Sequence, residues 1–332
     1  MRVFCAFLVA MTASAADVPQ AEISNRVIHA KLYLPDAEHG YYRGSRFDWS
    51  GVIESLTYRG HNYFGKWFQR YDPTLHDAIT GPVEEFRSAD GALGYDEAKP
   101  GGYFVKIGVG VLRKPDDKKY NFARKYEIVN GGHRVVRPGP DRVEFVHELD
   151  NGEGYAYVYQ KTVRLASSKP ELILEHSLKN TGRRVIDTSV YNHDFYMLDD
   201  QPAGPDYHIQ FAFAPHASGD FKGLAEIRGN ELVYRRELRP DGESAFSELT
   251  GFSDSAKDNN IVVENRKAGV GVREVGNRPL SLINFWSIRT TVCPEAYIHM
   301  HIEPGKTFKW RIVYHFYTLP ATSQGHGSAG TN

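Results

Sequence analysis

The sequence predicts an all-β fold, a sandwich or a barrel, and three observations support this prediction. Many short segments alternate apolar and polar residues, which is typical of strands with one buried face. Gly, Pro, Asn and Asp residues separate these segments at short intervals, as they do between strands. No segment has the periodicity of a long amphipathic helix, so we expect a domain built from many strands.

The expected strands follow one another along the whole chain. Residues 155–166 alternate tyrosines with smaller residues, and residues 170–193 contain two strands joined by a turn at 180–182. The segment 81–102 is rich in turn residues, and we expect a functional loop there. The clearest alternation lies near the end of the chain, where one strand face carries Phe308, Trp310, Ile312, Tyr314 and Phe316. The other expected strands are 26–34, 104–112, 142–149, 261–265, 280–288 and 297–303.

The composition limits the possible functions. The chain has 332 residues, of which 41% are hydrophobic, and this leaves ample apolar surface for a sizeable core. The formal net charge of -1 provides no basic field for nucleic acid. Aromatic residues make up 13%, which fits either sugar binding by stacking or simple strand formation. We expect one β domain over residues 17–320 and a disordered polar tail over residues 321–332.

Residues 1–16 have the pattern of a cleaved secretory signal peptide. Arg2 precedes an apolar run over residues 3–11, and small residues at 13–15 offer a cleavage site. This run is too short to span a bilayer, which takes about 18 residues, and no later segment is apolar enough to do so. We therefore expect a periplasmic or secreted protein without membrane insertion. The mature chain then keeps one cysteine, Cys293, which cannot form an internal disulfide.

Several polar residues near expected strands are candidates for chemistry. His193 shares a strand face with Tyr191, and this face also carries polar groups, so His193 is a packed core residue, a metal ligand or a proton donor. Glu295 is either a solvated charge or a carboxylate base that projects into a cleft. His299 and His301 share a face at a spacing that can hold a metal. No third ligand is visible nearby, so we prefer a polar sheet face.

Two segments resemble the aldose 1-epimerase (galactose mutarotase) superfamily. SLKNTGRRVIDTSVYNHDFYML is similar to the family's strand, turn and Asn-His element, and the resemblance implies that His193 is the general acid. VCPEAYIHMHIEPGKTFKW is similar to the family's Cys-x-Glu element followed by a strand, and it implies that Glu295 is the general base. Both segments occur in the family's order. The resemblance implies a galactose mutarotase-like β-supersandwich.

Mutarotation explains why the family uses this pair. A proton must leave the anomeric hydroxyl and another must reach the ring oxygen, so that the ring opens and closes on its other face. One acid and one base suffice for this, each contributing typically about 10²–10⁴-fold, and the resemblance implies no metal or cofactor. We expect His193 and Glu295 to face one cleft, roughly a sugar ring apart.

The sequence also departs from the family pattern. In the place of the family's second histidine stands Lys106, which either binds the ring oxygen or lies on a solvated strand face. The family's arginine element is missing, and Glu84, Glu85 and Arg87 stand near its place. These departures suggest an acidic, modified or oligomeric sugar as the substrate.

Further residues are expected to bind substrate. Arg46 and Asp48, beside Trp49, could bind hydroxyls or a carboxylate, or form a surface ion pair. Trp286 and Arg289 precede Glu295, and Arg289 either holds an anionic group or pairs with a structural acid. Asn192, Tyr191 and Glu85 complete the expected set of substrate-binding residues.

Three functions remain open on these residues. The first is an aldose 1-epimerase-like isomerase that interconverts sugar anomers. The second is a polysaccharide or oligosaccharide lyase on the same fold, in which Tyr191, His193, Lys106 and Arg289 act as base, acid and charge neutralisers. The third is a carbohydrate-binding protein without catalysis, which a large separation of His193 and Glu295 would favour.

Overall fold

The computed structural model describes residues 18–320, and this part of the chain is almost entirely β. The predicted all-β class is confirmed. Helical structure in the described part consists of short 3-10 turns, η1 (Leu198–Asp200), η2 (Phe221–Gly223) and η3 (Ala256–Asp258). No helix in residues 18–320 is long and apolar enough to cross a membrane. The predicted signal peptide and tail lie outside the described residues, and the domain boundaries stay a prediction.

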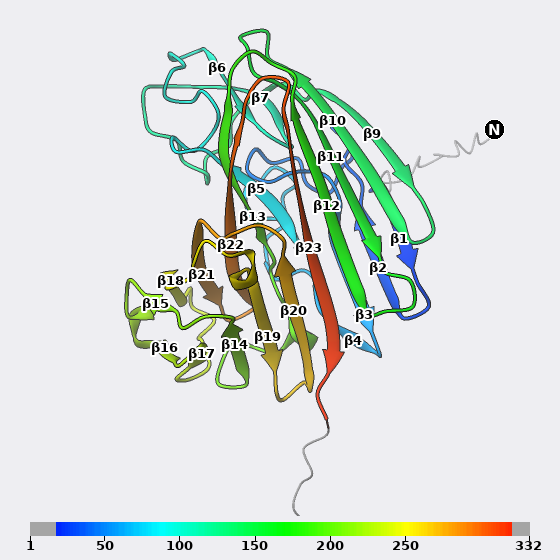
Figure 1. Ribbon diagram of the computed structural model, residues 1–332, viewed down its shortest axis with the longest axis vertical. Coiled ribbons are helices and arrows are strands. Elements are labelled where there is room, and N and C mark those ends of the chain that lie inside the picture. Colours follow the sequence, from blue (N-terminus) through cyan, green and yellow to red (C-terminus); the bar gives the residue numbers. More distant parts are fainter. Residues whose placement is uncertain (1–17, 321–332) are drawn as a thin grey trace, which may run out of the picture.

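A large antiparallel sheet of ten strands forms one layer, and its long strands lie side by side in Figure 1. The strands expected over residues 155–166, 170–193 and 307–317 are confirmed. They correspond to β11 (Ala156–Leu165), β12 (Glu171–Asn180), β13 (Ile186–His193) and β23 (Thr307–Thr318). The strand order is β16 (Ala225–Arg228), β17 (Glu231–Tyr234), β14 (Tyr207–Phe211), β19 (Asn260–Asn265), β20 (Val270–Gly276), β23 (Thr307–Thr318), β12 (Glu171–Asn180), β11 (Ala156–Leu165), β10 (Arg142–Asp150) and β9 (His133–Pro138).

A second sheet of six strands lies against the first. Its order is β15 (His216–Ala217), β18 (Ser244–Thr250), β21 (Leu282–Ile288), β22 (Thr291–Ile302), β13 (Ile186–His193) and β5 (Val83–Arg87). Two smaller sheets complete the described fold. They are β1 (Gln20–Ser24), β2 (Ile28–Tyr33), β3 (Val52–Tyr58) and β4 (His61–Asn62), and then β6 (Tyr103–Lys106), β7 (Gly110–Arg113) and β8 (Ile128–Asn130).

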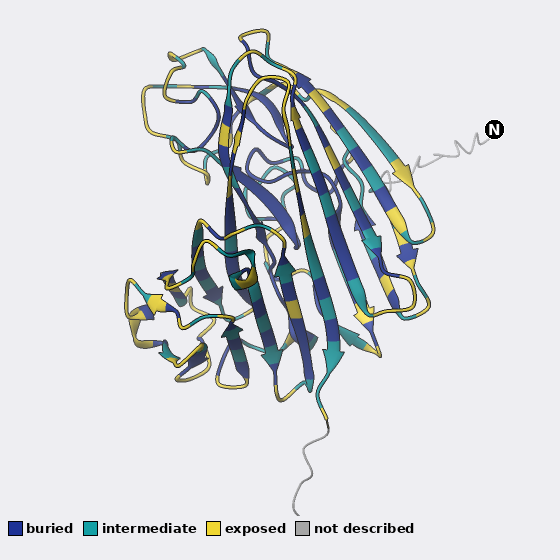
Figure 2. Ribbon diagram, in the orientation of Figure 1, coloured by how far each residue is buried: buried dark blue, intermediate teal, exposed yellow. Residues whose placement is uncertain are grey.

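The inner face of the six-stranded sheet packs on the ten-stranded sheet. Phe86 of β5 contacts Tyr159 of β11 edge to face, with ring centroids 5.4 Å apart, and Val190 and Trp310 belong to the same apolar cluster. Figure 2 shows the resulting stripes of buried and more exposed residues along the long strands. Because side chains alternate along a strand, the neighbours of Val190 point the other way. The outward face of β13 therefore carries Tyr191 and His193.

Two of the predicted elements are wrong. The single strand expected over residues 104–112 is a hairpin of β6 and β7, because the chain turns at Gly108, where φ is +80°. A Cβ atom at Gly108 would lie 2.6 Å from the Cβ of Asp48, so only glycine fits this turn. The loop expected over residues 81–102 contains β5, which pairs with β13 and lies inside the molecule.

Candidate active site

A cavity of about 340 Å³ opens on the outward face of the six-stranded sheet. The strands β5, β13, β18, β21 and β22 supply one wall. The loops before β3, before β5 and before β8 and the segment that follows β13 supply the rest. The cavity is large enough for a small ligand, since ligand pockets are commonly about 300–1,000 Å³. Its charged and amide-bearing lining residues are Arg46, Asp77, Arg87, His193, Asn284 and Glu295.

His193 and Glu295 meet directly in this cavity. Nε2 of His193 lies 3.3 Å from Oε1 of Glu295, so the two groups face one cavity but are closer than a sugar ring. The imidazole stacks on Phe195, with centroids 3.7 Å apart, and Trp286 meets it edge-on at 5.4 Å. These rings fix the orientation of the imidazole. Its buried Nδ1 has no hydrogen-bond partner among residues 18–320.

Both members of this pair favour their neutral forms. Burial raises the pKa of Glu295 to about 7, an effect that Arg46 opposes and the charge of Glu85 reinforces. Burial and the nearby Arg46 lower the pKa of His193 well below its usual value. The 3.3 Å contact is therefore not a full ion pair near pH 7, because the imidazole is neutral and the Glu295 carboxyl group exchanges its proton in this pH range. The carboxyl proton can pass between the two groups.

Glu85 lies at the centre of a buried ionic cluster behind this pair. Its carboxylate accepts hydrogen bonds from Arg46 Nε at 2.8 Å, from the Tyr191 hydroxyl at 2.6 Å and from Lys106 Nζ at 3.2 Å. Burial alone would raise the pKa of Glu85, but Arg46 and Lys106 hold it well below its usual range. Arg46 also contacts Asp77 at 2.5 Å. Glu85 is thus a buried anion that positions Arg46 and Tyr191 at the cavity wall.

Lys106 lies in this cluster and not on a solvated strand face. Its side chain is 1% exposed, and its amino group also donates to the carbonyl of Phe86 at 2.6 Å. Burial lowers the pKa of Lys106 to about 8, against the opposing charge of Glu85. Lys106 is not among the residues that line the cavity. It acts on the site through Glu85.

Aromatic rings form much of the remaining cavity wall. Trp67, whose indole nitrogen donates to the carbonyl of Ile79 at 2.9 Å, stacks on Phe195 with centroids 4.7 Å apart. Phe122 and Phe246 lie at the mouth of the cavity with 38% and 49% of their surface exposed. Exposed rings of this kind offer apolar faces to a ligand without contributing to the core.

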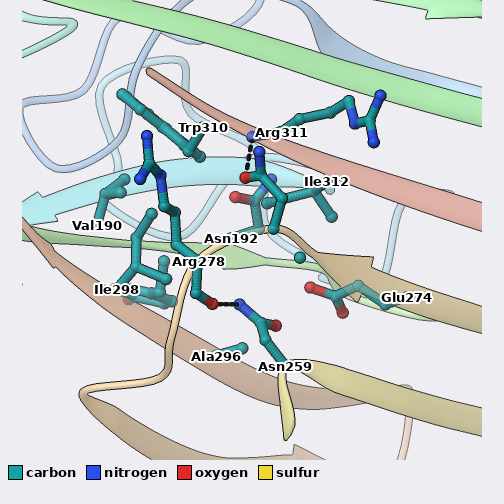
Figure 3. A pocket seen from close by; sticks show the side chains of 13 residues that line it. Val190, Asn192, Asn259, Glu274, Arg278, Ala296, Ile298, Trp310, Arg311 and Ile312 are labelled. Atoms are coloured by element: carbon teal, nitrogen blue, oxygen red, sulfur yellow. Dashed lines mark hydrogen bonds between the residues drawn. The ribbon is translucent and has the colours of Figure 1, made fainter. Parts of the chain in front are cut away.

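Glu85 and Lys106, which were expected to bind substrate, are buried and do not line the cavity, and two more of the expected substrate-binding residues also face the interior. Asp48 is fully buried and accepts a hydrogen bond from the backbone N–H of Ser50 at 3.0 Å. Asn192 is adjacent to His193 on β13 and therefore points to the opposite face, where it donates to Glu84 at 3.2 Å. Figure 3 shows Asn192 among the residues that line a different, small pocket, together with Glu274. Neither residue belongs to the cavity lining.

Arg289 also lies away from the cavity. It follows the end of β21, and its guanidinium pairs with Glu237 at 2.6 Å, which agrees with the structural alternative in the sequence analysis. Trp286, which is three residues earlier on β21, does line the cavity. Among residues 18–320, no group of three His, Cys, Asp or Glu side chains could hold a metal ion. His299 and His301 instead contact Asp187, at 3.6 Å and 2.7 Å.

Several other lining residues were not predicted from the sequence. Trp67, Asp77 and Phe122 come from long connections between strands, and only the folded chain brings them to the sheet. Asn284 could have been found, because alternation on β21 puts it on the same face as Trp286. Phe246 reaches the cavity mouth because β18 pairs with β21 and places it opposite Trp286.

Comparisons with known proteins show which solved structures have a similar architecture. No protein-family model matches the sequence, and no curated protein matches it. The structure is similar to that of a galactose mutarotase-like protein from Clostridium acetobutylicum, with a TM-score of 0.58 and 10% identity over 92% of this chain and 97% of that chain. The GalM/aldose epimerase homologue from C. elegans gives a TM-score of 0.57 and 13% identity, over 92% and 100%.

A galactose mutarotase related enzyme from Lactobacillus acidophilus is also similar, with a TM-score of 0.52 and 15% identity over 91% of this chain and 98% of that chain. These likenesses extend over nearly the whole length of each protein. At such low identity they concern the fold. The resemblance that two sequence motifs suggested is confirmed at this level, and the chain has the galactose mutarotase-like β-sandwich fold.

Proposed function

We propose that the protein is an aldose 1-epimerase-like isomerase that interconverts sugar anomers with His193 and Glu295. The observation that carries this proposal is the direct contact of an imidazole and a carboxyl group inside an aromatic-walled cavity. Trp67, Trp286 and Phe246 offer ring faces of the kind that stack on sugars, while Arg46 offers hydrogen-bond donors for hydroxyl groups.

The short distance between the two groups suits the chemistry. The oxygens that exchange protons in mutarotation, O1 and the ring oxygen, are bonded to the same carbon and are therefore adjacent. An acid and a base 3.3 Å apart can reach both from one side of the sugar, although we expected a separation of about one ring. The pKa of Glu295, about 7, suits a group that must both release and accept a proton near neutral pH.

The proposed reaction moves one proton in each direction. Transfer of the shared proton from Glu295 to His193 gives a carboxylate base and an imidazolium acid. Glu295 then removes the O1 proton, His193 protonates the ring oxygen, and the bond between that oxygen and C1 breaks to give the open-chain aldehyde. Rotation about the bond between C1 and C2, followed by the reverse steps, closes the ring as the other anomer and restores both groups.

Two alternatives have less support from the geometry. A lyase was expected to use Tyr191, His193, Lys106 and Arg289, but Lys106 is covered and Arg289 is outside the cavity. The pKa of Tyr191 is raised by burial and by Glu85, which disfavours its use as a base. A large separation of His193 and Glu295 would have favoured a binding protein without catalysis, but these two groups are in contact.

Proton NMR of freshly dissolved pure anomers tests the proposal. A panel of neutral sugars and uronic acids is mixed with the wild type, His193→Gln, Glu295→Gln and, as a control, Glu148→Gln, an exposed carboxylate on β10. We expect the wild type and the control to accelerate anomer equilibration of at least one sugar. Each active-site variant should lose about 10²–10⁴-fold. No acceleration of any sugar by the wild type would refute the proposal.

Export is a separate part of the proposed function. The pattern of residues 1–16 supports it, and a protein outside the cytoplasm meets free and polymeric sugars rather than sugar phosphates. N-terminal sequencing of the protein isolated from its native host tests this part. A mature chain that begins near Ala16 or Asp17 is expected, whereas a chain that retains Met1 and Arg2 would contradict it.

A further inference from the structure

A second hollow continues the active-site cavity. Its volume is about 420 Å³, and Arg87 and Asn284 line both hollows. Tyr297 lines the second hollow and donates a hydrogen bond to Glu295 at 3.3 Å, so its ring forms a wall between the catalytic pair and the hollow. The two spaces are therefore neighbouring parts of one groove on the outward face of the six-stranded sheet.

The groove follows the strands of this sheet. On β22 it runs from Glu295 to His299, and on β13 it runs from His193 to Ser189. Ser189 pairs with His299 on one side and with Arg87 on the other, so these side chains share the outward face. Four residues along a strand correspond to about 13 Å. The groove thus adds a considerable length beyond the cavity that contains the catalytic pair.

Arg87 is a cation at the junction of the two hollows that contacts no carboxylate directly. It is half-buried, and no carboxylate of residues 18–320 forms an ion pair with it. Against the effect of burial, the charge of Glu85 at longer range and a hydrogen bond with Tyr297 raise the pKa of Arg87. Arg46, on the other side of Glu85, has two such partners, Glu85 and Asp77. A half-buried guanidinium that lacks a carboxylate is prepared to bind one from a ligand, because its planar fork matches two carboxylate oxygens.

The acidic side chains of the groove do not pair with Arg87, so Arg87 can bind a carboxylate of a ligand. Asp187 is engaged by His299 and His301, at 3.6 Å and 2.7 Å. Glu248 lies on β18, on the far wall from Arg87, and it is exposed to solvent. An exposed carboxylate is well screened, whereas a half-buried guanidinium keeps more of its attraction.

We propose that this groove binds an acidic oligosaccharide, with Arg87 holding the carboxylate of a uronic acid unit next to the reducing end. The inference rests on the proposed function, because it places the reducing-end ring at His193 and Glu295. It adds the substrate class: a chain of several sugar units with a negative charge, and not a free monosaccharide. The groove beyond Tyr297 then receives the remaining units along β13 and β22.

Binding of methyl glycosides tests this inference without turnover, because their rings cannot open. Calorimetry compares the methyl glycosides of the monomers and of the trimers of galacturonic, mannuronic and glucuronic acid. It also compares each trimer with the trimer whose carboxyl groups are methyl esters, which has nearly the same size but no charge. We expect at least one acidic trimer to bind about tenfold or more tightly than its ester and than its monomer, since hydrogen bonds to charged groups are the strong ones. A sulfated neutral trimer distinguishes recognition of carboxylate from recognition of sulfate.

Matched variants connect this preference with Arg87. Arg87→Gln should reduce the ratio of affinities for acid and ester to near one, and Arg87→Lys should keep part of it, since lysine retains the charge but not the fork. Arg137→Gln, which removes an exposed charge on β9, should leave the ratio unchanged. Thermal unfolding of each variant checks that it folds, and Arg87→Lys keeps the test valid if Arg87→Gln does not.

The outcomes separate this inference from the proposed function. Equal affinities for acid and ester in the wild type, or for trimer and monomer, would overturn the inference even if monosaccharides equilibrate faster with the protein. Selective binding of an acidic trimer with no acceleration of any anomer would support the groove and refute the isomerase. An unchanged ratio in folded Arg87→Gln would refute the role of Arg87.

Discussion

Replacing Glu295 with glutamine should stabilise the folded protein above neutral pH while it removes the proposed activity. The side chain of Glu295 is 8% exposed, and the cavity disfavours its ionised form. Glutamine has nearly the same shape, carries no charge and can still accept the hydrogen bond from Tyr297. The wild-type carboxylate therefore reduces stability, as is common for groups in functional sites, and its proposed role is proton transfer.

The size of this effect follows from the pKa of Glu295. Burial raises that pKa from 4.5 to about 7, so the folded chain binds the proton more tightly than the unfolded chain. The stability that this proton contributes is fully present below about pH 4.5 and is lost as the pH rises through 7. The difference of about 2.5 pH units, at 1.36 kcal/mol for each, corresponds to a loss of roughly 3 kcal/mol by pH 8. Glutamine does not titrate and avoids this loss.

Urea unfolding at pH 5 and pH 8 measures the effect. The free energy of unfolding of Glu295→Gln should exceed that of the wild type by about 1 kcal/mol at pH 5 and by roughly 3 kcal/mol at pH 8. Glu148→Gln is the control, and its difference from the wild type should not change with pH. If Glu295 and His193 formed an ion pair, Glu295→Gln would be the less stable protein at pH 8. That result, or a difference independent of pH, would refute the reasoning.

Three other substitutions or treatments test separate parts of the structure. Glu85→Ala leaves Arg46 and Lys106 without their shared partner, so its free energy of unfolding in urea should be lower by about 3–5 kcal/mol. A decrease of less than about 1 kcal/mol would contradict the role of Glu85 in the cluster. Phe246→Ala should change the free energy of unfolding by less than about 0.5 kcal/mol, because the ring is exposed. Calorimetry should show sugar binding weaker by about 1 kcal/mol, and an unchanged affinity would show that this ring does not contact the ligand. Cys293 is fully buried, and burial raises the pKa of its thiol. Mass spectrometry should therefore find Cys293 alkylated by iodoacetamide only in denaturant, and rapid labelling of the native protein would contradict its burial.

The strand pattern of the fold could be predicted wherever a local alternation was clear. The outward face of β13, with Tyr191 and His193, follows directly from the period of two residues. β5 was missed because turn residues surround it, and the adjacent Glu84 and Glu85 give it no clear alternation. Both are fully buried, since distant elements supply Lys161 to one side and Lys106 to the other. Such partners leave no mark in the local sequence.

The site could be predicted only in part for the same physical reason. The motif residues His193 and Glu295 lie together, and Arg46, Tyr191 and Trp286 line the same cavity. Alternation alone should have excluded Asn192, because it is the immediate neighbour of His193 on a strand. Trp67, Asp77 and Phe122 reach the cavity from loops, whose course depends on the whole fold.

Burial is the main cause of the pKa shifts of His193 and Glu295, and the buried ionic cluster adjusts them. Arg46 and Lys106 both donate to Glu85 and compensate the charge of that carboxylate. After burial, Arg46 lowers the pKa of both His193 and Glu295, whereas the charge of Glu85 raises both. Lys106 therefore contributes neither as a ligand for the ring oxygen nor as a solvated charge. It keeps Glu85 ionised in the interior, and this anion helps to keep a proton on the pair that the proposed reaction needs.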